Sequence, residues 1–392
     1  MLERVLVLLM GGDPTRFRRY GGEDELLPRL PQAYTYVGSL QEMGVKVSVR
    51  SIGGVIVQDR KGGKPPGWWK PYLGLILAIC WSSKYDAVVT WSTGGALFAD
   101  MAAILTRQSR KIAIISYANY HGTSGKLSNR VRQILYRRML QGSGRVLFMT
   151  HRQMDEAITQ FGCEPGRVAY LPVGVDTRFF APSPAYADAV VREQLRGLDT
   201  QKYVVVAGEQ LRQERLIAPV LEGLDIGLVR LTQNKYTEQL WREWVQRKSV
   251  SFPVLCIAHL NSHEVRYVYQ RALCLVNLVD SSWQPAGWTV MTEAMACGLP
   301  VIVNRGLTTE EMRTYTTPAG PLPFLEIEHL DPLEARSRLH ELVESAEKRR
   351  QIGLLAREFV ERHFNIEKTA KIAYRILYHM VAEYQGQVAP GV

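Results

Sequence analysis

Short apolar runs alternate with longer amphipathic segments along the first half of the chain. The strand-length runs cover residues 4–10, 45–52, 86–91, 111–117, 145–150 and 167–173. Segments of helical length lie between them, at residues 31–44, 68–83, 95–107, 126–141 and 152–161. Buried strands that alternate with helices form βαβ units, so this pattern predicts a doubly wound parallel sheet.

The alternation stops at residues 174–201 and then starts again. That segment contains two prolines around a serine and has no strand-like run. Strand-length runs return at residues 202–208, 225–231, 252–260, 274–280 and 300–305, and residues 333–385 read as helical. The second half therefore predicts a second sheet of the same kind.

Taken together, these patterns predict an α/β protein of two Rossmann-like, doubly wound domains facing a cleft. A chain of 392 residues exceeds one hydrophobic core, which also favours two domains. We place the first domain at residues 1–173, a linker at 174–201 and the second domain at 202–370. Residues 371–392 are predicted to form a last helix that packs back on the first domain.

Composition narrows the class of protein. With 46% hydrophobic and 22% charged residues, the chain is neither disordered nor fibrous. Its five cysteines form no CxxC motif, which argues against a zinc site and a disulfide framework. The longest apolar run, 72–81, is about half of a membrane-spanning helix. We expect a cytoplasmic protein.

The net charge of +10 is unevenly distributed. Residues 1–180 hold 24 Lys and Arg against 13 Asp and Glu, whereas the remainder holds 24 against 25. This asymmetry predicts an anionic partner for the first half: nucleic acid, a membrane surface or a phosphorylated substrate. No helix-turn-helix, RRM or zinc-finger pattern is present, so we do not expect nucleic acid.

Two segments carry much of the basic excess. Residues 126–145 place Lys126, Arg130, Arg137 and Arg138 around an apolar helix, and residues 61–81 place Trp68, Trp69 and Tyr72 beside lysines. Basic helices with interfacial aromatic residues bind anionic membranes, so peripheral association with the inner face of the membrane is one reading. In the other reading, both segments bury their apolar faces on the sheet.

The stretch QPAGWTVMTEAMACGLPVIV, 284–303, joins a glycine turn, a helix and a strand. Thr289 is a candidate N-cap and Gly298 a candidate residue just after the last turn. The free N–H groups of a helix N-terminus bind phosphate groups. Glu293, in the second turn, is placed to accept hydrogen bonds from a pair of ribose hydroxyls; alternatively it is a capping or surface acid.

Several segments resemble one known family. EAMACGLPVIV resembles the nucleotide-sugar signature of GT-B glycosyltransferases, glycosyltransferase family 4 in particular. LPVGVDTRFFAP, 171–182, resembles the hinge segment of that family, and residues 149–172 and 349–378 resemble its neighbouring unit and its closing helices. The resemblance spans nearly the whole chain.

The resemblance implies a retaining, metal-independent hexosyltransferase without a cofactor. Its donor would be a UDP or GDP sugar, and its acceptor a carbohydrate or a lipid-linked or phosphorylated molecule of glycan biosynthesis. The absence of an Asp-x-Asp motif from the chain agrees with metal independence. The alternatives are a GT-B phosphorylase and a sugar-nucleotide binder without transferase activity.

The resemblance also assigns donor-binding residues. Glu293 would bind the ribose, and the backbone of Ala286, Gly287, Trp288 and Thr289 would meet the sugar or diphosphate. The family has a second glutamate eight residues before Glu293, where this chain has Pro285, with Gln284 as the nearest substitute.

A second departure from the family follows the strand at 202–208. The family has Gly-Arg there and a lysine about five residues on; this chain has Gly208 followed by Glu209. Arg212 and Arg215 are the candidates to hold the diphosphate, since guanidinium groups bind phosphate through two parallel hydrogen bonds. A solvated helix start is the other interpretation.

In the first half, the candidates lie in loops after strands. His121 resembles the family histidine near the donor hexose and the acceptor, and Tyr117 and Asn119 lie in the same loop. Gly21 and Gly22 form a candidate glycine loop, in which the backbone can approach a ligand closely. Residues 10–14 compete for that role.

Overall fold

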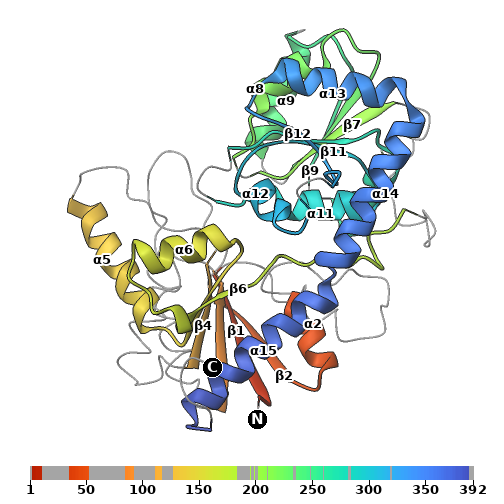
Figure 1. The fold of residues 1–392 in the computed structure, drawn as a ribbon. Coiled ribbons are helices and arrows are strands. Elements are labelled where there is room, and N and C mark those ends of the chain that lie inside the picture. The colour runs from red at the N-terminus through yellow and green to blue at the C-terminus, as the bar shows by residue number, and fades with distance from the viewer. Residues whose placement is uncertain are drawn as a thin grey trace. The chain divides into compact units, whose positions relative to one another are not determined.

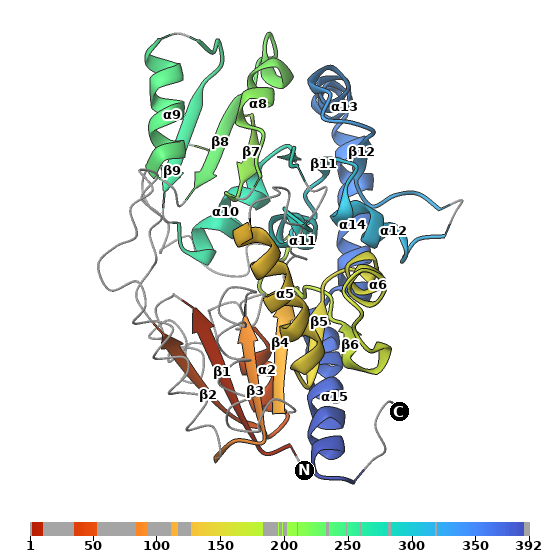
Figure 2. The same ribbon diagram turned by 90° about the vertical axis from the view of Figure 1, so that its left-hand side faces the viewer.

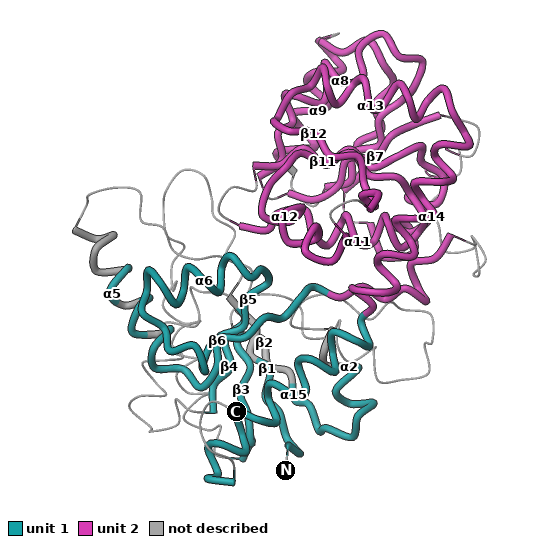
Figure 3. Tube along the Cα trace, in the orientation of Figure 1, with its two compact units in different colours: residues 1–25, 30–173, 366–392 teal, residues 26–29, 174–365 magenta. Residues whose placement is uncertain are grey.

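The computed structural model describes residues 2–10, 35–52, 84–91, 111–116, 127–182, 195, 198, 202–209, 211–232, 235–247, 249–258, 260–280, 284–317 and 320–387. These residues form two compact units (Figure 3). Of the described residues, unit 1 contains those up to Val173 and again from Ile366, and unit 2 contains those from Gly174 to Asn365. Unit 2 thus starts at the first residue of the predicted linker, and unit 1 resumes five residues before the last helix, which was predicted from residue 371.

The first unit is built on a six-stranded parallel sheet (Figures 1 and 2). Its spatial order is β2-β1-β3-β4-β5-β6, so the strand order reverses between β1 and β3. The strands are β1 (Arg4–Met10), β2 (Lys46–Ile52), β3 (Ala87–Trp91), β4 (Ile112–Ser116), β5 (Arg145–Phe148) and β6 (Val168–Tyr170). All six strands predicted from the apolar runs are therefore confirmed.

Helices of unit 1 come from both ends of the chain. They are α2 (Thr35–Glu42), α5 (Leu127–Gly142), α6 (His151–Thr159), a short 3₁₀ turn at Pro165–Arg167, and α15 (Ile366–Tyr384). From α5, Tyr136 and Leu140 are buried against Val146 and Phe148 of β5. The C-terminal helix α15 packs beside α2 (Figure 1), and Glu383 on it forms a buried ion pair with Arg145.

The second unit contains another six-stranded parallel sheet, ordered β12-β11-β10-β7-β8-β9. The strands are β7 (Tyr203–Ala207), β8 (Gly227–Thr232), β9 (Val254–Ala258), β10 (Leu275–Asn277), β11 (Val301–Asn304) and β12 (Leu325–Ile327). This is the strand order of dinucleotide-binding folds. The pattern predicted five of these strands but not β12, because three residues that include Glu326 carry too weak an apolar signal.

Seven helices are described around this second sheet: α8 (Glu214–Leu221), α9 (Lys235–Gln246), α10 (Ser262–Arg271), α11 (Trp288–Ala296), α12 (Leu307–Arg313), α13 (Pro332–Glu344) and α14 (Ala346–His363). Helices α8, α9 and α13 bury apolar side chains in one core with the strands. On the other face, α11 contacts β10 and β11 and packs on α14 (Figure 1). Within the described ranges, no helix has the length and hydrophobicity needed to cross a membrane.

The start of unit 2 is held to its own helices. Arg357 of α14 donates hydrogen bonds to the carbonyl oxygens of Thr177 at 2.8 Å and Phe180 at 2.5 Å, and it also binds the last turn of α11 at Ala296. The Asp176 carboxylate accepts hydrogen bonds from two following backbone N–H groups, both at 3.1 Å. Residues 176–180 are therefore an anchored part of unit 2.

Candidate functional site

The strand order of unit 2 reverses between β7 and β10, which lie side by side. In open α/β sheets, ligands bind beyond the carboxyl ends of the strands at such a point. The described residues of the loops that leave these two strands, 208–209 and 211–213 after β7 and 278–280 and 284–287 after β10, contain most of the predicted donor-binding residues. We therefore describe this edge of the sheet as the candidate site.

The two loops are joined to each other through their backbones. The Gln213 N–H donates to the Leu278 carbonyl at 3.1 Å, and the Asp280 N–H donates to the Leu211 carbonyl at 3.0 Å. Leu211 has a positive φ of 57°, which costs free energy in a residue with a branched side chain. Since strained backbone persists only where surrounding contacts hold it, the loop conformation is enforced by its neighbours.

Arg212 and Gly208 are in direct contact within the first loop. The Arg212 Nε donates to the Ala207 carbonyl at 2.6 Å. Gly208 has a φ of +88°, and a Cβ placed there would lie 2.6 Å from Arg212 Nη2. The other predicted cation, Arg215, is exposed in the first turn of α8. Of the two, only Arg212 is held in the loop at the strand-order reversal.

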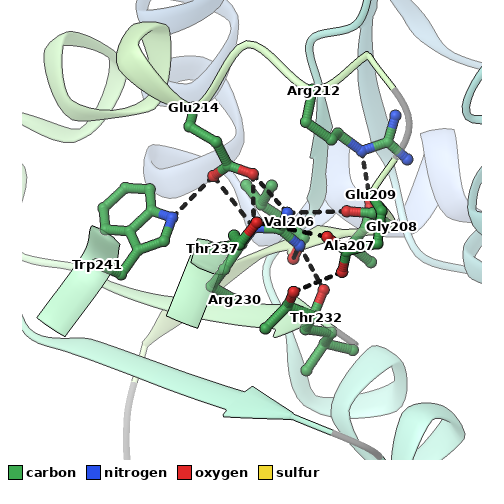
Figure 4. Close-up of polar contacts among 11 residues, drawn as sticks. Val206, Ala207, Gly208, Glu209, Arg212, Glu214, Arg230, Thr232, Thr237 and Trp241 are labelled. Atoms are coloured by element: carbon green, nitrogen blue, oxygen red, sulfur yellow. Dashed lines mark hydrogen bonds and ion pairs between the residues drawn. The ribbon is translucent and has the colours of Figure 1, made fainter. Parts of the chain in front are cut away.

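The acids of this region are bound to neighbouring side chains (Figure 4). The Glu209 carboxylate accepts hydrogen bonds from the Thr232 hydroxyl at 2.5 Å and the Thr237 hydroxyl at 3.4 Å. Glu214 lies five residues after Glu209, where the resemblance expects lysine, and it pairs with the buried Arg230. Both glutamates are thus engaged by neighbouring groups within unit 2.

Helix α11 begins immediately after the glycine turn. Gly287 is its N-cap, with a φ of +81°, and Trp288 is the first helical residue. The predicted N-cap, Thr289, is wrong because the left-handed Gly287 already turns the chain into the helix. Gly298 is confirmed as the residue after the last turn: its φ is +73°, and Leu299 N–H donates to Ala294 at 3.0 Å.

Two buried side chains at the start of α11 were not assigned structural roles by the sequence. Asn277, at the end of β10, is fully buried, and among the described residues neither of its amide atoms has a hydrogen-bond partner. A Cβ on Gly287 would overlap its Nδ2 and lie 2.8 Å from its Oδ1. The Trp288 ring is buried edge-on against Phe364, 5.4 Å between centroids. A ligand could therefore meet Trp288 only through its backbone.

Glu293 is half-buried in the second turn of α11. The protein atoms around its carboxyl raise its pKa from 4.5 to about 8, through loss of hydration. Burial, and then Glu293 itself, raise the pKa of the nearby Tyr269, while Arg212 lowers it. Glu293, Tyr269 and Arg212 therefore share one electrostatic neighbourhood.

The second loop is braced by β11 and α12. The Asn304 amide binds Val279 in both directions, with N–H to Oδ1 at 2.8 Å and Nδ2 to carbonyl at 2.9 Å. The Thr308 hydroxyl donates to the Ala286 carbonyl at 3.0 Å. Gln284, two residues before Ala286, is only 6% exposed. Sequence reasoning missed both bracing residues, although the position of Asn304 at the end of an apolar strand was a usable signal.

The predicted residues of the first half lie outside the described residues. These are Gly21, Gly22, Tyr117, Asn119 and His121, and the basic segment at 61–81 also lies outside. In the other basic segment, Ile134 of α5 is 58% exposed. Arg137 of the same helix donates through Nε to the Phe161 carbonyl at 2.9 Å. This guanidinium group therefore binds the backbone of unit 1.

Within the described part of the chain, no group of three or more His, Cys, Asp or Glu side chains is arranged to hold a metal ion. The four cysteines described are not paired. Burial raises the pKa of Cys163 to about 11 and that of Cys256 to about 12, so these thiols stay protonated at neutral pH.

Comparison with known proteins agrees with this arrangement. Residues 212–373, somewhat less than half of the chain, match the family model described as glycosyl transferase-like. A glycosyltransferase from Rickettsia africae superposes over 97% of this chain and 99% of its own, with a TM-score of 0.69 and 13% identity. HepE of Anabaena with bound UDP-glucose superposes over 98% and 100%, with a TM-score of 0.66 and 15% identity.

The chain has the GT-B fold. Two parallel sheets with their helices confirm the predicted α/β class and the two Rossmann-like units. The cleft that this fold implies between the units stays a prediction. A protein described as a UDP-N-acetylglucosamine 2-epimerase, from Listeria monocytogenes, also superposes, over 99% and 98% with a TM-score of 0.59 and 12% identity. No curated protein sequence matches the chain. The GT-B fold alone thus leaves the reaction open.

Proposed function

We propose that this protein is a glycosyltransferase that takes its sugar from a nucleotide-diphosphate donor bound at the candidate site of unit 2. The observation that carries the proposal is the joining of two loops at the strand-order reversal, one of which holds Arg212 while the other leads into α11, the helix that carries Glu293. The match of residues 212–373 to a glycosyl transferase-like model supports it, because that range includes both residues.

Each part of the donor has a candidate partner. The diphosphate would meet the N-terminus of α11 and Arg212, with Arg215 close by on α8, since helix N–H groups and guanidinium groups both favour phosphate. The ribose hydroxyls would bind Glu293. Gln284 and the backbone at Ala286 and Gly287 would face the transferred sugar. UDP is the first nucleotide to test, because HepE was crystallised with UDP and with UDP-glucose.

We extend the proposal to a retaining, metal-independent hexosyl transfer. Backbone N–H groups and arginine would stabilise the leaving diphosphate in the role that a metal ion has elsewhere. His121 would position the donor sugar or the acceptor. The acceptor is proposed to be a carbohydrate or a lipid-linked or phosphorylated molecule, in keeping with the excess of positive charge in the first half.

Peripheral membrane contact is part of the same proposal. The exposed Ile134 on a helix that also carries Arg137 and Arg138 supports it. Co-sedimentation with vesicles of neutral and anionic lipid tests it, with Ile134→Ser as the variant. Equal binding to both lipid compositions would contradict an electrostatic membrane contact.

The experiment that tests the donor site is a thermal-shift screen of UDP, GDP and their sugars with wild type, Glu293→Ala and a control. Binding to the native state raises the melting temperature by mass action, so the base is identified directly. Glu344→Gln, which alters an exposed acid at the end of α13, is the control. An equal shift in Glu293→Ala and wild type would refute the ribose assignment.

A second candidate is a GT-B enzyme or binder without ordinary transfer activity, such as a phosphorylase. The buried Gln284 and Pro285, in place of the family's first glutamate, favour it. Two incubations separate the candidates. Release of nucleotide diphosphate from a radiolabelled nucleotide sugar that depends on an added acceptor indicates transfer, whereas sugar phosphate released from an added glycan, only in the presence of phosphate, indicates a phosphorylase.

A further inference from the structure

One charged side chain, Arg230, lies in strand β8, whose other residues are uncharged. All six residues of β8 are buried, and the Arg230 side chain has no exposed surface. An ionised group in such a place is costly unless it is paired and its donors are satisfied. The contacts of the buried guanidinium therefore indicate its role.

Its partners surround the first loop of the candidate site (Figure 4). Arg230 Nε donates to both carboxylate oxygens of Glu214, at 3.0 and 3.1 Å, and Nη2 also binds that carboxylate. Nη2 donates to the Gly208 carbonyl at 2.8 Å. The Trp241 indole N–H donates to Oε2 of Glu214, at 2.8 Å. Gly208 begins the loop and Glu214 follows it, so a single guanidinium holds both ends.

Apolar residues could fill the same volume but could not reproduce this geometry. A buried ion pair is often no more stabilising than apolar residues of similar size, because both ions lose their hydration. The N–H groups of Arg230, in contrast, fix the direction of the Gly208 carbonyl, and thereby the left-handed turn at Gly208 on which Arg212 packs. The ion pair therefore fixes the conformation of the loop at Gly208 more than it stabilises the fold.

We propose that Arg230, paired with Glu214, is a positioning residue that holds the 208–213 loop in the conformation that binds the donor diphosphate. This inference rests on the proposed function for its ligand. Arg230 itself touches no substrate, since it is buried behind the loop. It acts through Gly208 and Arg212.

Two variants test the proposal: Arg230→Lys, and the double variant Arg230→Met with Glu214→Leu. The double variant replaces the ion pair with apolar side chains but leaves the Trp241 N–H without its acceptor, so it is expected to fold with a melting temperature somewhat below that of wild type. In both variants the amides of Gln213 and Asp280, which join the loop to its neighbour, should exchange hydrogen about tenfold faster. The UDP dissociation constant should rise about tenfold, because the loop loses preorganisation.

Two controls separate positioning from general packing. Trp241→Phe removes one hydrogen bond to Glu214 but leaves the contact between Arg230 and Gly208, so exchange and affinity should stay near wild type. Arg145→Met with Glu383→Leu replaces the buried ion pair of unit 1 and should leave the loop amides unchanged.

Unchanged exchange at Gln213 and Asp280 in both Arg230 variants would overturn the inference, and so would faster exchange with an unchanged dissociation constant for UDP. If wild type binds no nucleotide in the screen above, the proposed function fails instead; the exchange measurement needs no ligand and still decides whether Arg230 holds the loop.

Discussion

The two loops at the candidate site are held by different kinds of contact. The loop after β7 is held by charge: Arg230 and Glu214 form a buried ion pair across it, and Glu209 accepts hydrogen bonds from threonine hydroxyls. The loop after β10 is held by neutral groups, the Asn304 amide and the Thr308 hydroxyl, and it ends in a glycine that caps α11. The same edge of one sheet thus combines a charged and an uncharged support.

This difference bears on how the site would receive an anion. Glu214 is compensated by Arg230, so this carboxylate need not repel a diphosphate. In α11, the helix that follows the second loop, the one acid is Glu293. Its pKa of about 8 keeps most of this carboxyl group protonated at neutral pH. A diphosphate near the helix N-terminus would therefore meet little negative charge from α11 before binding.

The largest effect on stability and on UDP binding is expected at Gly287, where no space is left for a side chain. Gly287→Ala places a Cβ against the buried Asn277 at a φ of +81°, so it should cost about 3 kcal/mol of unfolding free energy. UDP binding should be lost with it. Urea unfolding and calorimetry measure both. Gly386→Ala is the matched control, since its φ is +71° but no atom lies within 4 Å; an equal loss in both variants would show that backbone strain alone is responsible.

A second prediction concerns the titration of Glu293. Its folded-state pKa lies above its unfolded value, so the folded state holds the proton more tightly. Stability should therefore fall as the pH rises from about 5 to about 8, by on the order of 2 kcal/mol once the shift is discounted for the partial exposure of the side chain, and Glu293→Gln should remove this fall. Urea unfolding at several pH values measures it. Parallel curves for wild type and Glu293→Gln would refute the assignment, and Glu344→Gln serves as the control.

A third prediction sharpens the contrast between the two arginines near the first loop. Arg212→Ala should raise the dissociation constant for UDP about tenfold, because a held guanidinium bound to phosphate loses little entropy. Arg215→Ala, on the exposed face of α8, should raise it only about threefold. Titration calorimetry with UDP and with uridine checks this. Equal losses for uridine would mean that neither residue acts through the phosphates.

The smallest effect is expected from the neutral support of the second loop. Thr308→Val removes the hydroxyl that donates to the Ala286 carbonyl, which should cost about 1 kcal/mol of unfolding free energy. UDP affinity should fall less than in Arg230→Lys. Thr316→Val, which removes a local hydroxyl bond to Arg313, is the control for the substitution itself. An affinity loss as large as that of Arg230→Lys would mean that both loops are equally critical.

Local patterns predicted most of the secondary structure. The apolar runs correctly marked eleven of the twelve described strands, because parallel strands buried on both faces read as continuous hydrophobic segments. They missed β12, whose three residues include a charged one. The helix 288–296 and its terminal Gly298 were also readable from sequence, but its N-cap was placed two residues late, at Thr289, since no local signal shows that Gly287 is left-handed.

The candidate site was only partly readable. Gly208, Arg212, Gly287 and Glu293 were predicted from sequence, and the structure brings the loops that carry them to one edge of the sheet. Arg230, Asn304 and Thr308 were missed, because their roles depend on partners 16 to 25 positions away in the chain. An arginine inside the apolar run of β8 was the one local sign that a buried charge needed a partner.

By itself the sequence determined the α/β class and the two-unit organisation of strands and helices, which follow from periodicity, a local property. Its resemblance to a known family named the donor-binding residues, which stay predictions. Only the tertiary structure decided that the glutamates at 209 and 214 are bound to neighbouring groups, that Trp288 faces the core, and that Glu293 has a pKa near 8. Hydration, pairing and burial depend on atoms that the fold brings together from distant positions, and no local pattern encodes them.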